Sequence, residues 1–254
     1  RADELRNAHA RAAELRAAFA GWRGEAGEGA VRWVEAYAQS AVLNRTPLDV
    51  APIFAQQLAG AKRAWILTSA TLSVGGDFSH YQSELGLAEA ATRHWESPYD
   101  FASQALLYVP EGLPDPNSPG YTEAVIDAAF PVIEAALGRA FLLFTSLRAM
   151  DIGHARLKEK LAGAGLDWPV LLQGTAGKNE LLERFRDTAN AILLGSQSFW
   201  EGVDVKGEAL SLVVIDKLPF NPPDDPVLAA RIEQINRAGG NAFMQYQVPR
   251  AVIS

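Results

Sequence analysis

Apolar residues recur at intervals of three and four along the first 22 residues of the chain. They are Leu5, Ala8, Ala12, Leu15, Phe19 and Trp22. This spacing places them on one face of a helix, and it predicts a single amphipathic helix over residues 1–22. The run "GEAGEG" then breaks the helical pattern. We favour packing of the apolar face on its own domain over docking on a partner element.

The next 50 residues predict a hairpin, a helix and a strand. Residues 31–50, "VRWVEAYAQSAVLNRTPLDV", fit a hairpin that ends at "NRTP", with Pro47 starting the next helix. "APIFAQQLA" (51–59) predicts that helix. "AWILTSATL" (64–72) predicts a buried strand that runs into a hydroxyl-rich loop.

A different sequence pattern begins at about residue 103, where short apolar runs alternate with helical stretches. The runs are "ALLYV" (105–109), "AFLLFTS" (140–146), "PVLLQG" (169–174), "AILLGS" (191–196) and "LSLVVID" (210–216), and the helical stretches cover 121–137, 147–164 and 178–187. The runs are continuously apolar, so both faces of the sheet should be covered. This alternation predicts an α/β fold with a parallel sheet flanked by helices. Pro131 predicts a kink or the start of a second helix within 121–137.

Polar residues follow four of the predicted strands directly. They are "TSATL" after "AWIL", "TSL" after "FLLF", "QG" after "VLL", and "GSQSFWEGVD" after "AILL". In open α/β sheets ligands bind beyond the carboxyl ends of the strands. Hydroxyl, amide and glycine backbone groups donate hydrogen bonds without adding charge, which suits phosphate and sugar oxygens. The pattern therefore predicts a phosphate-binding or sugar-binding edge, and the alternative is a set of ordinary turns.

Composition narrows the class of protein. The 254 residues can form one large or two modest domains. A net charge of -7 argues against a uniformly basic surface that binds nucleic acid, although it is compatible with a local binding groove. The chain has no cysteine, which excludes thiolate ligands, and its four histidines are scattered, so we expect no metal site within it. No run approaches the ~20 apolar residues of a membrane span. We expect a cytoplasmic protein without membrane contact.

Six segments resemble one protein family. "LTSATL" (67–72), "LLFTSLRAM" (142–150), "GSQSFWEGVDVKG" (195–207) and "VVIDKLPFNPPDDPV" (213–227) resemble motifs of the DinG/YoaA family of bacterial helicases, which are XPD-like members of superfamily 2. "TPLDVAPIF" (46–54) is similar to the family segment before motif III, and residues 231–254 are closer to the YoaA type. The resemblance covers most of the chain from residue 31 onward.

The resemblance implies a division into three parts. Residues 1–58 would be a helical, arch-like segment and the return to motor domain 1, and residues 59–102 the end of that RecA-like domain. Residues 103–254 would be an incomplete RecA-like motor domain 2. The chain has no G-x-x-x-x-G-K-[ST] phosphate loop and no DEAH-type box, and it stops at "AVIS", where the family continues into motif VI. We therefore expect a helicase fragment that is inactive alone, with any iron–sulfur cluster in the missing N-terminal part.

The resemblance also implies roles for the loop at 195–207, which corresponds to motif V. Ser196, Gln197 and Ser198 would donate to the DNA backbone. Gly202 would allow a close approach of the backbone to the nucleotide, and Asp204 would accept from the ribose or from an arginine on the ATP side. The remaining ATP-side candidate is Glu201, for which pairing with a neighbouring basic residue is the alternative. Trp200 is interpreted as a packing anchor in preference to a base-stacking platform.

Other strand ends receive roles by the same resemblance. Ser69 and Thr71 of motif III would couple the ATP state to the grip on DNA, and the alternative is a local Ser/Thr turn. The DNA-contacting candidates are Thr145 and Ser146 of motif IV, with Gln173 and Gly174 at the next strand end. Lys217 would contact phosphate or brace Asp216, or simply lie on the surface.

The family implies an ATP-dependent DNA helicase that uses ATP and Mg²⁺ and moves 5′ to 3′ along single-stranded DNA in the bacterial cytoplasm. It would unwind forked DNA in replication or repair, with replication and repair proteins as candidate partners. The alternative from another class is a non-catalytic RecA-like module that binds such a partner. A Rossmann-type enzyme does not fit, because no glycine fingerprint opens a strand-to-helix turn.

Overall fold

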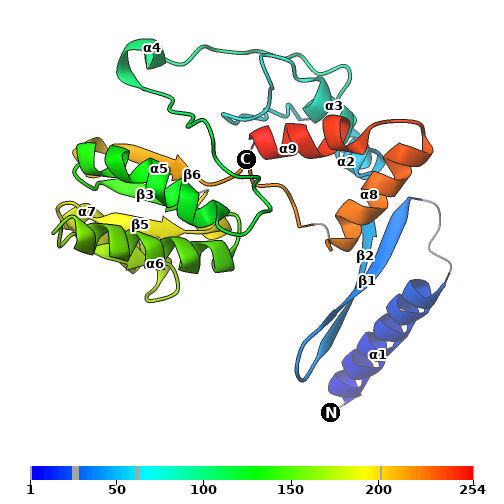
Figure 1. Cartoon of the computed structure of the whole chain (residues 1–254). Helices are drawn as coiled ribbons and strands as arrows, with labels where there is room; N and C mark the ends of the chain where they lie inside the picture. Colours follow the sequence, from blue (N-terminus) through cyan, green and yellow to red (C-terminus); the bar gives the residue numbers. More distant parts are fainter. Residues whose placement is uncertain (1, 25–28, 61–62, 201, 223, 254) are drawn as a thin grey trace. The chain divides into compact units, whose positions relative to one another are not determined.

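The structure is a computed structural model that describes residues 2–24, 29–60, 63–200, 202–222 and 224–253 (Figure 1). Its internal contacts divide the chain into two units, Trp95–Phe220 and Arg1–His94 with Asn221–Ile253. The domain boundaries predicted after residues 58 and 102 were placed by the family motifs. The division by internal contacts does not test them, so they stay a prediction. Each unit is described by itself.

The unit Trp95–Phe220 contains a four-stranded parallel sheet in the order β4-β5-β3-β6. Its strands are β3 (Ala140–Leu143), β4 (Val170–Leu172), β5 (Ile192–Gly195) and β6 (Leu212–Ile215). At the carboxyl edge Leu143 of β3 lies opposite Gly195 of β5 and Ile215 of β6. This confirms the predicted parallel sheet.

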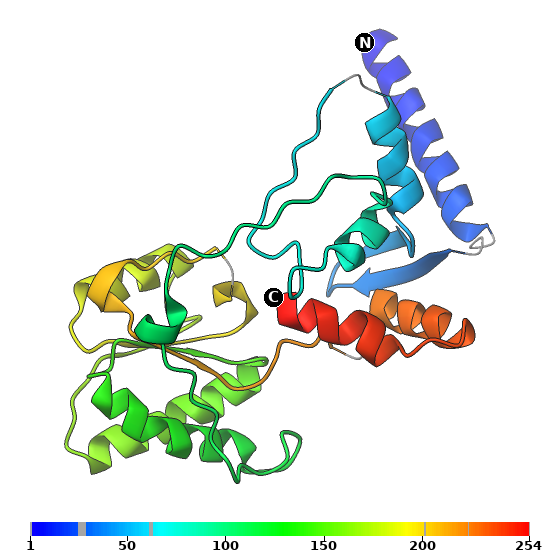
Figure 2. The same cartoon turned by 90° about the horizontal axis from the view of Figure 1, so that it is seen from above.

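Helices cover both faces of the central strands β3 and β5, as their continuously apolar sequences predict (Figures 1 and 2). At the edge strand β6 the same expectation is wrong, because Val213 and Ile215 are 49% and 48% exposed. Helices α5 (Tyr121–Ala135) and α6 (Leu147–Gly163) pack on one face, where Ile126, Ile133 and Leu157 are fully buried. Helix α7 (Lys178–Asp187) packs on the other face through Leu181, Leu182 and Phe185. In Figure 2 the green α5 and α6 lie on one side of the strands, and α7 lies on the other. The α/β, RecA-like fold class is thus confirmed.

Helix α5 runs without interruption through Pro131, so the alternative of a second helix starting there is wrong. Proline removes one backbone donor from the helix. Phe130 and Ile133 on either side of it are buried in the core, and this packing holds the helix across the missing hydrogen bond.

Two predicted strands do not form. Residues 64–67 and 105–109 have no regular structure, and Ile66 and Leu106 are 84% and 92% exposed. A strand needs a neighbour for its backbone hydrogen bonds, and no described strand pairs with either segment. Apolar composition alone therefore did not produce a buried strand at these two sites. The short helix α4 (Phe101–Gln104) precedes the second segment.

The other unit contains the predicted hairpin. Strands β1 (Ala30–Ala36) and β2 (Ala41–Pro47) pair antiparallel, with Ala36 opposite Ala41. Pro47 lies opposite Ala30 at the end of β2, so its predicted role as the start of a helix is wrong. Helix α2 (Ala51–Ala59) begins later, where the Asp49 carboxylate accepts a hydrogen bond from the Ala51 N–H at 2.9 Å. That side-chain acceptor fixes the start of the helix beyond the proline.

Helix α1 (Ala2–Arg23) forms as predicted, but most of its apolar face does not pack on its own unit. Leu5 and Leu15 are 72% and 65% exposed. The C-terminal end is held by the hairpin: Trp22 donates from Nε1 to the Asn44 carbonyl at 2.9 Å, and Arg32 donates to the Trp22 carbonyl at 2.6 Å. The favoured interpretation, packing of the apolar face on its own domain, is met at the last turn beside the hairpin and is not met at Leu5 or Leu15.

The remaining elements bring the end of the chain against its earlier part within this unit. They are α3 (Ser79–Leu85), α8 (Pro226–Arg237), the π-helical turn Phe243–Gln247 and α9 (Val248–Ile253). Glu84 of α3 forms ion pairs with Arg231 of α8 at 3.5 Å and Arg250 of α9 at 3.4 Å. No helix among the described residues is long and apolar enough to span a membrane.

Candidate functional site

The carboxyl edge of the parallel sheet brings three of the predicted strand ends together. Strands β4, β5 and β3 are neighbours, so Gln173, Ser196 and Thr145 follow adjacent strands at one edge. The shared edge follows from the strand order and agrees with the expectation that ligands bind there.

Ser196 and Gln173 bond to each other. The Gln173 side-chain oxygen accepts hydrogen bonds from the Ser196 N–H at 2.7 Å and from the Ser196 hydroxyl at 3.1 Å. Ser196 is buried. Its hydroxyl therefore links the end of β5 to the end of β4 by a hydrogen bond. This structural role of Ser196 was not predicted from the sequence. Gly174, with φ +94°, lies exposed beside the pair.

The turn after β3 is held by a carboxylate that sequence reasoning did not place in the site. Asp216, which directly follows β6, accepts from the Thr145 N–H at 3.1 Å through Oδ1. Lys217 Nζ lies 3.8 Å from Asp216 Oδ2, an ion pair that agrees with the bracing alternative, while contact of Lys217 with phosphate stays a prediction. Ser146 accepts from the Ala149 N–H at 3.1 Å and caps α6, while Thr145 and Ser146 both remain exposed. The sequence feature that could have identified Asp216 as a site residue is its position directly after an apolar strand, which places it at the same edge of the sheet.

Burial raises the pKa of the Asp216 carboxyl above its usual range, and Lys217 and the Thr145 N–H oppose that rise. A carboxyl with a higher pKa in the folded protein than in the unfolded chain stabilises the fold when protonated. That contribution is complete below the unfolded pKa of about 3.9 and is lost as pH rises through the folded pKa.

Asp216→Asn should therefore flatten the dependence of stability on pH. Asparagine keeps an oxygen that can accept from the Thr145 N–H, but it does not titrate. Urea unfolding from about pH 4 to pH 7 should show the wild type losing stability relative to the variant as pH rises. Asp167→Asn, at an exposed position of the same unit, is the control. Parallel pH curves for the wild type and Asp216→Asn would contradict the prediction.

The loop after β5 packs on the α7 face of the sheet. Phe199 of the 3₁₀ turn Gln197–Phe199 is buried, and Trp200, Val203 and Val205 pack against the same cluster as Leu181 of α7. Trp200 thus contacts the core, as its interpretation as a packing anchor expects. A Cβ at Gly195 would lie 2.8 Å from Phe199 Cγ, so glycine allows this close return of the chain.

Two cations of α7 bind backbone carbonyls of this loop. Lys178 Nζ donates to the exposed Ser198 at 2.5 Å, and Arg186 Nη2 donates to Asp204 at 2.7 Å. Eight residues of helix separate the two cations, which is about 12 Å of rise. The structure therefore places Ser198 and Asp204 near opposite ends of α7 and not in one cluster.

Of the three candidates on the ATP side, the structure describes Gly202 and Asp204. The Asp204 carboxylate is 75% exposed and lies 3.7 Å from Lys206 Nζ, and an exposed pair of this kind contributes little to stability. Gly202 is exposed with φ +66°. Glu201 and the side chain of Gln197 lie outside the described residues. A further 3₁₀ turn, Gly207–Ala209, leads into β6.

Ser69 and Thr71 belong to the other unit. Their hydroxyl oxygens lie 3.2 Å apart, and Ser69 Oγ accepts from the Thr71 N–H at 3.2 Å. Both residues are exposed. The structure shows a local Ser/Thr turn, and the coupling role stays a prediction.

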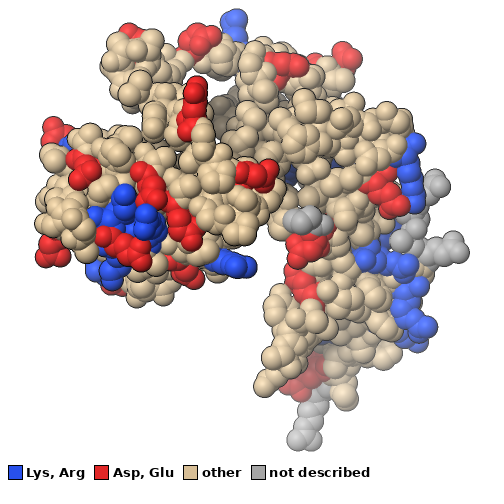
Figure 3. Space-filling model, in the orientation of Figure 1, with Lys and Arg blue, Asp and Glu red and all other residues tan. Residues whose placement is uncertain are grey.

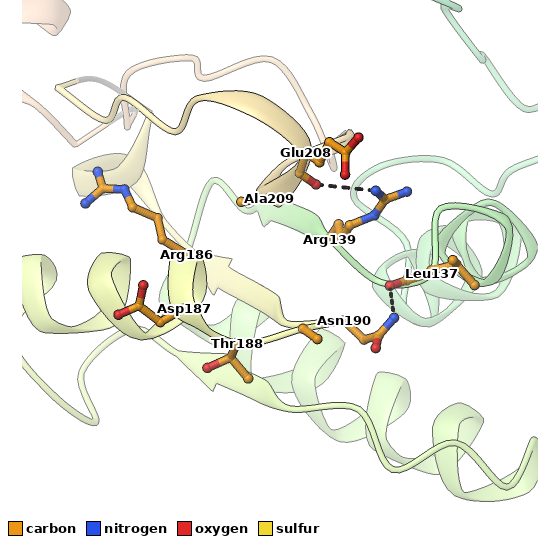
Figure 4. A pocket seen from close by; sticks show the side chains of 9 residues that line it. Leu137, Arg139, Arg186, Asp187, Thr188, Asn190, Glu208 and Ala209 are labelled. Atoms are coloured by element: carbon orange, nitrogen blue, oxygen red, sulfur yellow. Dashed lines mark hydrogen bonds between the residues drawn. The ribbon is translucent and has the colours of Figure 1, made fainter.

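A hollow of about 400 Å³ lies at the opposite, amino edge of the sheet (Figure 4). It is lined by residues before β3, β5 and β6 and by the end of α7: Leu137, Arg139, Arg186, Asp187, Thr188, Ala189, Asn190, Glu208 and Ala209. Asn190 donates to the Leu137 carbonyl at 2.7 Å across it. The hollow is formed by strand starts, so it is separate from the strand-end residues Thr145, Gln173 and Ser196. Arg186, which lines it, also donates to the Asp204 carbonyl.

Charge does not mark one broad basic surface on the face seen in Figure 3, where acidic and basic side chains are interspersed. Near the strand ends, Lys178 and Lys217 are engaged with Ser198 and Asp216. The described residues contain no group of three His, Asp or Glu side chains arranged to hold a metal ion. The donors at this edge are thus mainly hydroxyl, amide and backbone groups.

Comparison with known proteins gives the same family from independent matches. A helicase C-terminal domain model matches residues 130–254. The ATP-dependent DNA helicase YoaA of Escherichia coli (strain K12) is 44% identical over 224 residues, which cover 87% of this chain and 34% of that protein. The ATP-dependent helicase DinG of Mycobacterium tuberculosis (strain ATCC 25618 / H37Rv) is 39% identical over 84% of this chain and 32% of its own length.

A third relative is named for a different activity. The 3'-5' exonuclease DinG of Bacillus subtilis (strain 168) is 32% identical over 87% of this chain and 25% of its own length. The chain spans about a third or less of the curated relatives that it matches. By these identities the chain belongs to the DinG/YoaA-like helicases, of which it forms a part, and its residues 130–254 match the model of the helicase C-terminal domain.

Proposed function

We propose that this chain is part of an ATP-dependent DNA helicase that couples ATP hydrolysis to movement along single-stranded DNA. The observation that carries the proposal is the carboxyl edge, where Thr145, Gln173 and Ser196 follow three adjacent parallel strands. The relatives named as ATP-dependent DNA helicases support the assignment of DNA and ATP as ligands.

On the DNA side, we assign the exposed residues Thr145, Ser146 and Ser198, together with the Gly174 backbone, to phosphate contacts. Neutral donors position a nucleic-acid backbone without reading its sequence. Ser196 and Gln173 then act mainly by fixing the two strand ends, because their polar atoms bond to each other. Gln197 stays in the DNA-binding set by its motif position alone.

On the nucleotide side, we assign Gly202, Asp204 and, by motif position, Glu201. The Asp204 carboxylate is solvent-exposed, so it can accept a hydrogen bond from a ribose or from an arginine. The described residues do not fit an Mg²⁺ site, and a chain without cysteine cannot ligate an iron–sulfur cluster through thiolates. We propose that the rest of the helicase supplies the metal-binding residues.

The finer features follow from the family. We propose 5′-to-3′ movement, action on forked DNA in replication or repair with proteins of those processes as partners, and a bacterial cytoplasmic location. Ser69 and Thr71 would link the ATP state to the grip on DNA. The domain boundaries after residues 58 and 102 belong to the same proposal.

The deciding experiment measures ATP hydrolysis by the full-length protein with and without single-stranded DNA, followed by unwinding of forks with 5′ or 3′ tails. DNA-stimulated hydrolysis and unwinding of 5′-tailed forks would support the proposal. Absence of hydrolysis, with retained binding of a replication or repair protein, would favour the non-catalytic module instead.

The 254-residue chain alone should show no ATP hydrolysis above background. It contains no phosphate-loop motif, and its described residues form no carboxylate site for Mg²⁺. Phosphoryl transfer depends on both features to position and neutralise the phosphates. A phosphate-release assay with purified chain, with and without single-stranded DNA, tests this. Turnover that rises with DNA would contradict it.

Single-stranded DNA should bind this chain weakly and with a shallow dependence on salt. Each neutralised phosphate contributes a slope of ~0.7 log units in affinity per log unit of salt on single strands. Lys178 and Lys217 at the sheet edge already contact protein oxygens. Fluorescence anisotropy across salt concentrations should therefore give a slope below about 2, or fewer than about three phosphates. A slope of about 4 or more would place the DNA on another surface.

A further inference from the structure

Helix α7 contacts the 196–207 loop at both of its ends with cationic side chains. We infer that Lys178 and Arg186 are positioning residues: Lys178 sets the DNA-facing part of the loop, and Arg186 sets its nucleotide-facing part. The inference rests on the proposed function for the identity of the two ligands. The contacts that carry it are independent of that function.

Lys178 holds the first half of the loop. Its ammonium donates to the Ser198 carbonyl at 2.5 Å and lies 5.5 Å from the centre of the Phe199 ring. A Cβ built on Gly202 would lie 3.9 Å from the same nitrogen. The ammonium therefore lies close to the backbone on both sides of Trp200, where a carbonyl and an aromatic ring both favour a cation.

Arg186 holds the second half. Its guanidinium donates to the Asp204 carbonyl at 2.7 Å, on the residue whose carboxylate is assigned to the nucleotide side. Asp204 keeps its own side chain exposed while its backbone is fixed.

The apolar contacts of the loop do not fix the direction of its polar groups. Val203 and Val205 pack on the cluster that contains Leu182 and Phe185 of α7, which holds the loop against the helix. Dispersion and hydrophobic contacts are non-directional. The two cations add direction, because each fixes one carbonyl and thereby the orientation of the adjoining backbone. Their spacing of eight residues turns them by about 80° around the axis of α7, so both lie within one half of the helix surface.

Loss of one cation should disturb one half of the loop and one ligand. Lys178→Met in the full-length protein should raise the DNA concentration for half-maximal ATP hydrolysis by about three- to tenfold, the effect of one net hydrogen bond. Its kcat at saturating DNA should stay near the wild-type value. Arg186→Met should instead raise KM for ATP or lower kcat by a similar factor, with little change in DNA dependence. Lys178→Arg and Arg186→Lys should restore part of each effect.

Arg184→Met is the matched control, because Arg184 is exposed on the same helix and has no hydrogen bond or ion pair among the described residues. Amide hydrogen exchange of the 254-residue chain supplies a readout without DNA or ATP. Exchange should speed up by about three- to tenfold in peptides around 197–200 for Lys178→Met and around 203–206 for Arg186→Met.

The outcomes separate the inference from the proposed function. Local exchange changes together with the split kinetics would support it. Unchanged loop exchange, or the same kinetic loss in both variants and in Arg184→Met, would overturn it. A full-length protein without DNA-stimulated hydrolysis would refute the proposed function, and the exchange measurements would still decide whether the two cations hold the loop.

Discussion

Asp204→Ala should cut ATP turnover of the full-length protein by about ten- to a hundredfold. A charge-assisted hydrogen bond contributes ~1.5–3 kcal/mol, and ~1.4 kcal/mol corresponds to a factor of ten in rate. The substitution should have little effect on stability, because the carboxylate is exposed and its partner Lys206, at 3.7 Å, is also exposed. Arg186 binds the Asp204 carbonyl, which alanine retains. Steady-state hydrolysis at saturating DNA is the measurement.

The comparison variant for Asp204→Ala is Ser198→Ala, on the other half of the loop. It should weaken DNA binding and leave turnover at saturating DNA near the wild-type value, because Ser198 is assigned to phosphate. Asp204→Ala should leave DNA affinity without nucleotide nearly unchanged. Both variants should unfold like the wild type. Full turnover in Asp204→Ala, or a loss confined to DNA binding, would show that the division of the loop into two ligand sides is wrong.

The sequence predicted the parallel sheet well because each strand there has its neighbour within the chain. Residues 140–143 and 192–195 are continuously apolar, and both faces of their strands are covered by helices. Residues 64–67 and 105–109 have the same kind of composition, but no described strand pairs with them. The pattern of apolar residues indicates how a strand would be buried, but it does not indicate whether a neighbouring strand is present to pair with it.

The site was predicted less completely than the fold. Strand order places Gln173 and Ser196 at one edge, as their positions after strands predict, but a residue's place in a motif does not show which atom its hydroxyl contacts. Ser196 bonds to Gln173, and the buried Asp216 holds the Thr145 turn. Both contacts join residues far apart in the sequence, so only the assembled sheet reveals them.

The opposite edge of the sheet depends on a close backbone approach at Gly138. This residue has φ +72°, and a Cβ on it would lie 2.3 Å from the Asn190 carbonyl oxygen and 2.8 Å from its carbonyl carbon. Asn190 is itself held by its hydrogen bond to the Leu137 carbonyl at 2.7 Å. The obstructing atoms are backbone, so they cannot turn away as the end of a flexible side chain can.

Gly138→Ala should therefore destabilise the unit Trp95–Phe220 by about 3 kcal/mol, the sum of ~1 kcal/mol for left-handed backbone and ~2 kcal/mol for the forced shift. Gly165→Ala separates the two contributions, because Gly165 has φ +69° but no atom within 4 Å of a built Cβ. It should cost about 1 kcal/mol, so amides of β3 and β5 should exchange about thirtyfold faster in Gly138→Ala than in Gly165→Ala. Hydrogen exchange of these core strands reports this unit alone, whatever the other unit does. Equal exchange in the two variants would mean that the chain relaxes around a methyl group at position 138, and that the close approach to Asn190 does not limit the fold.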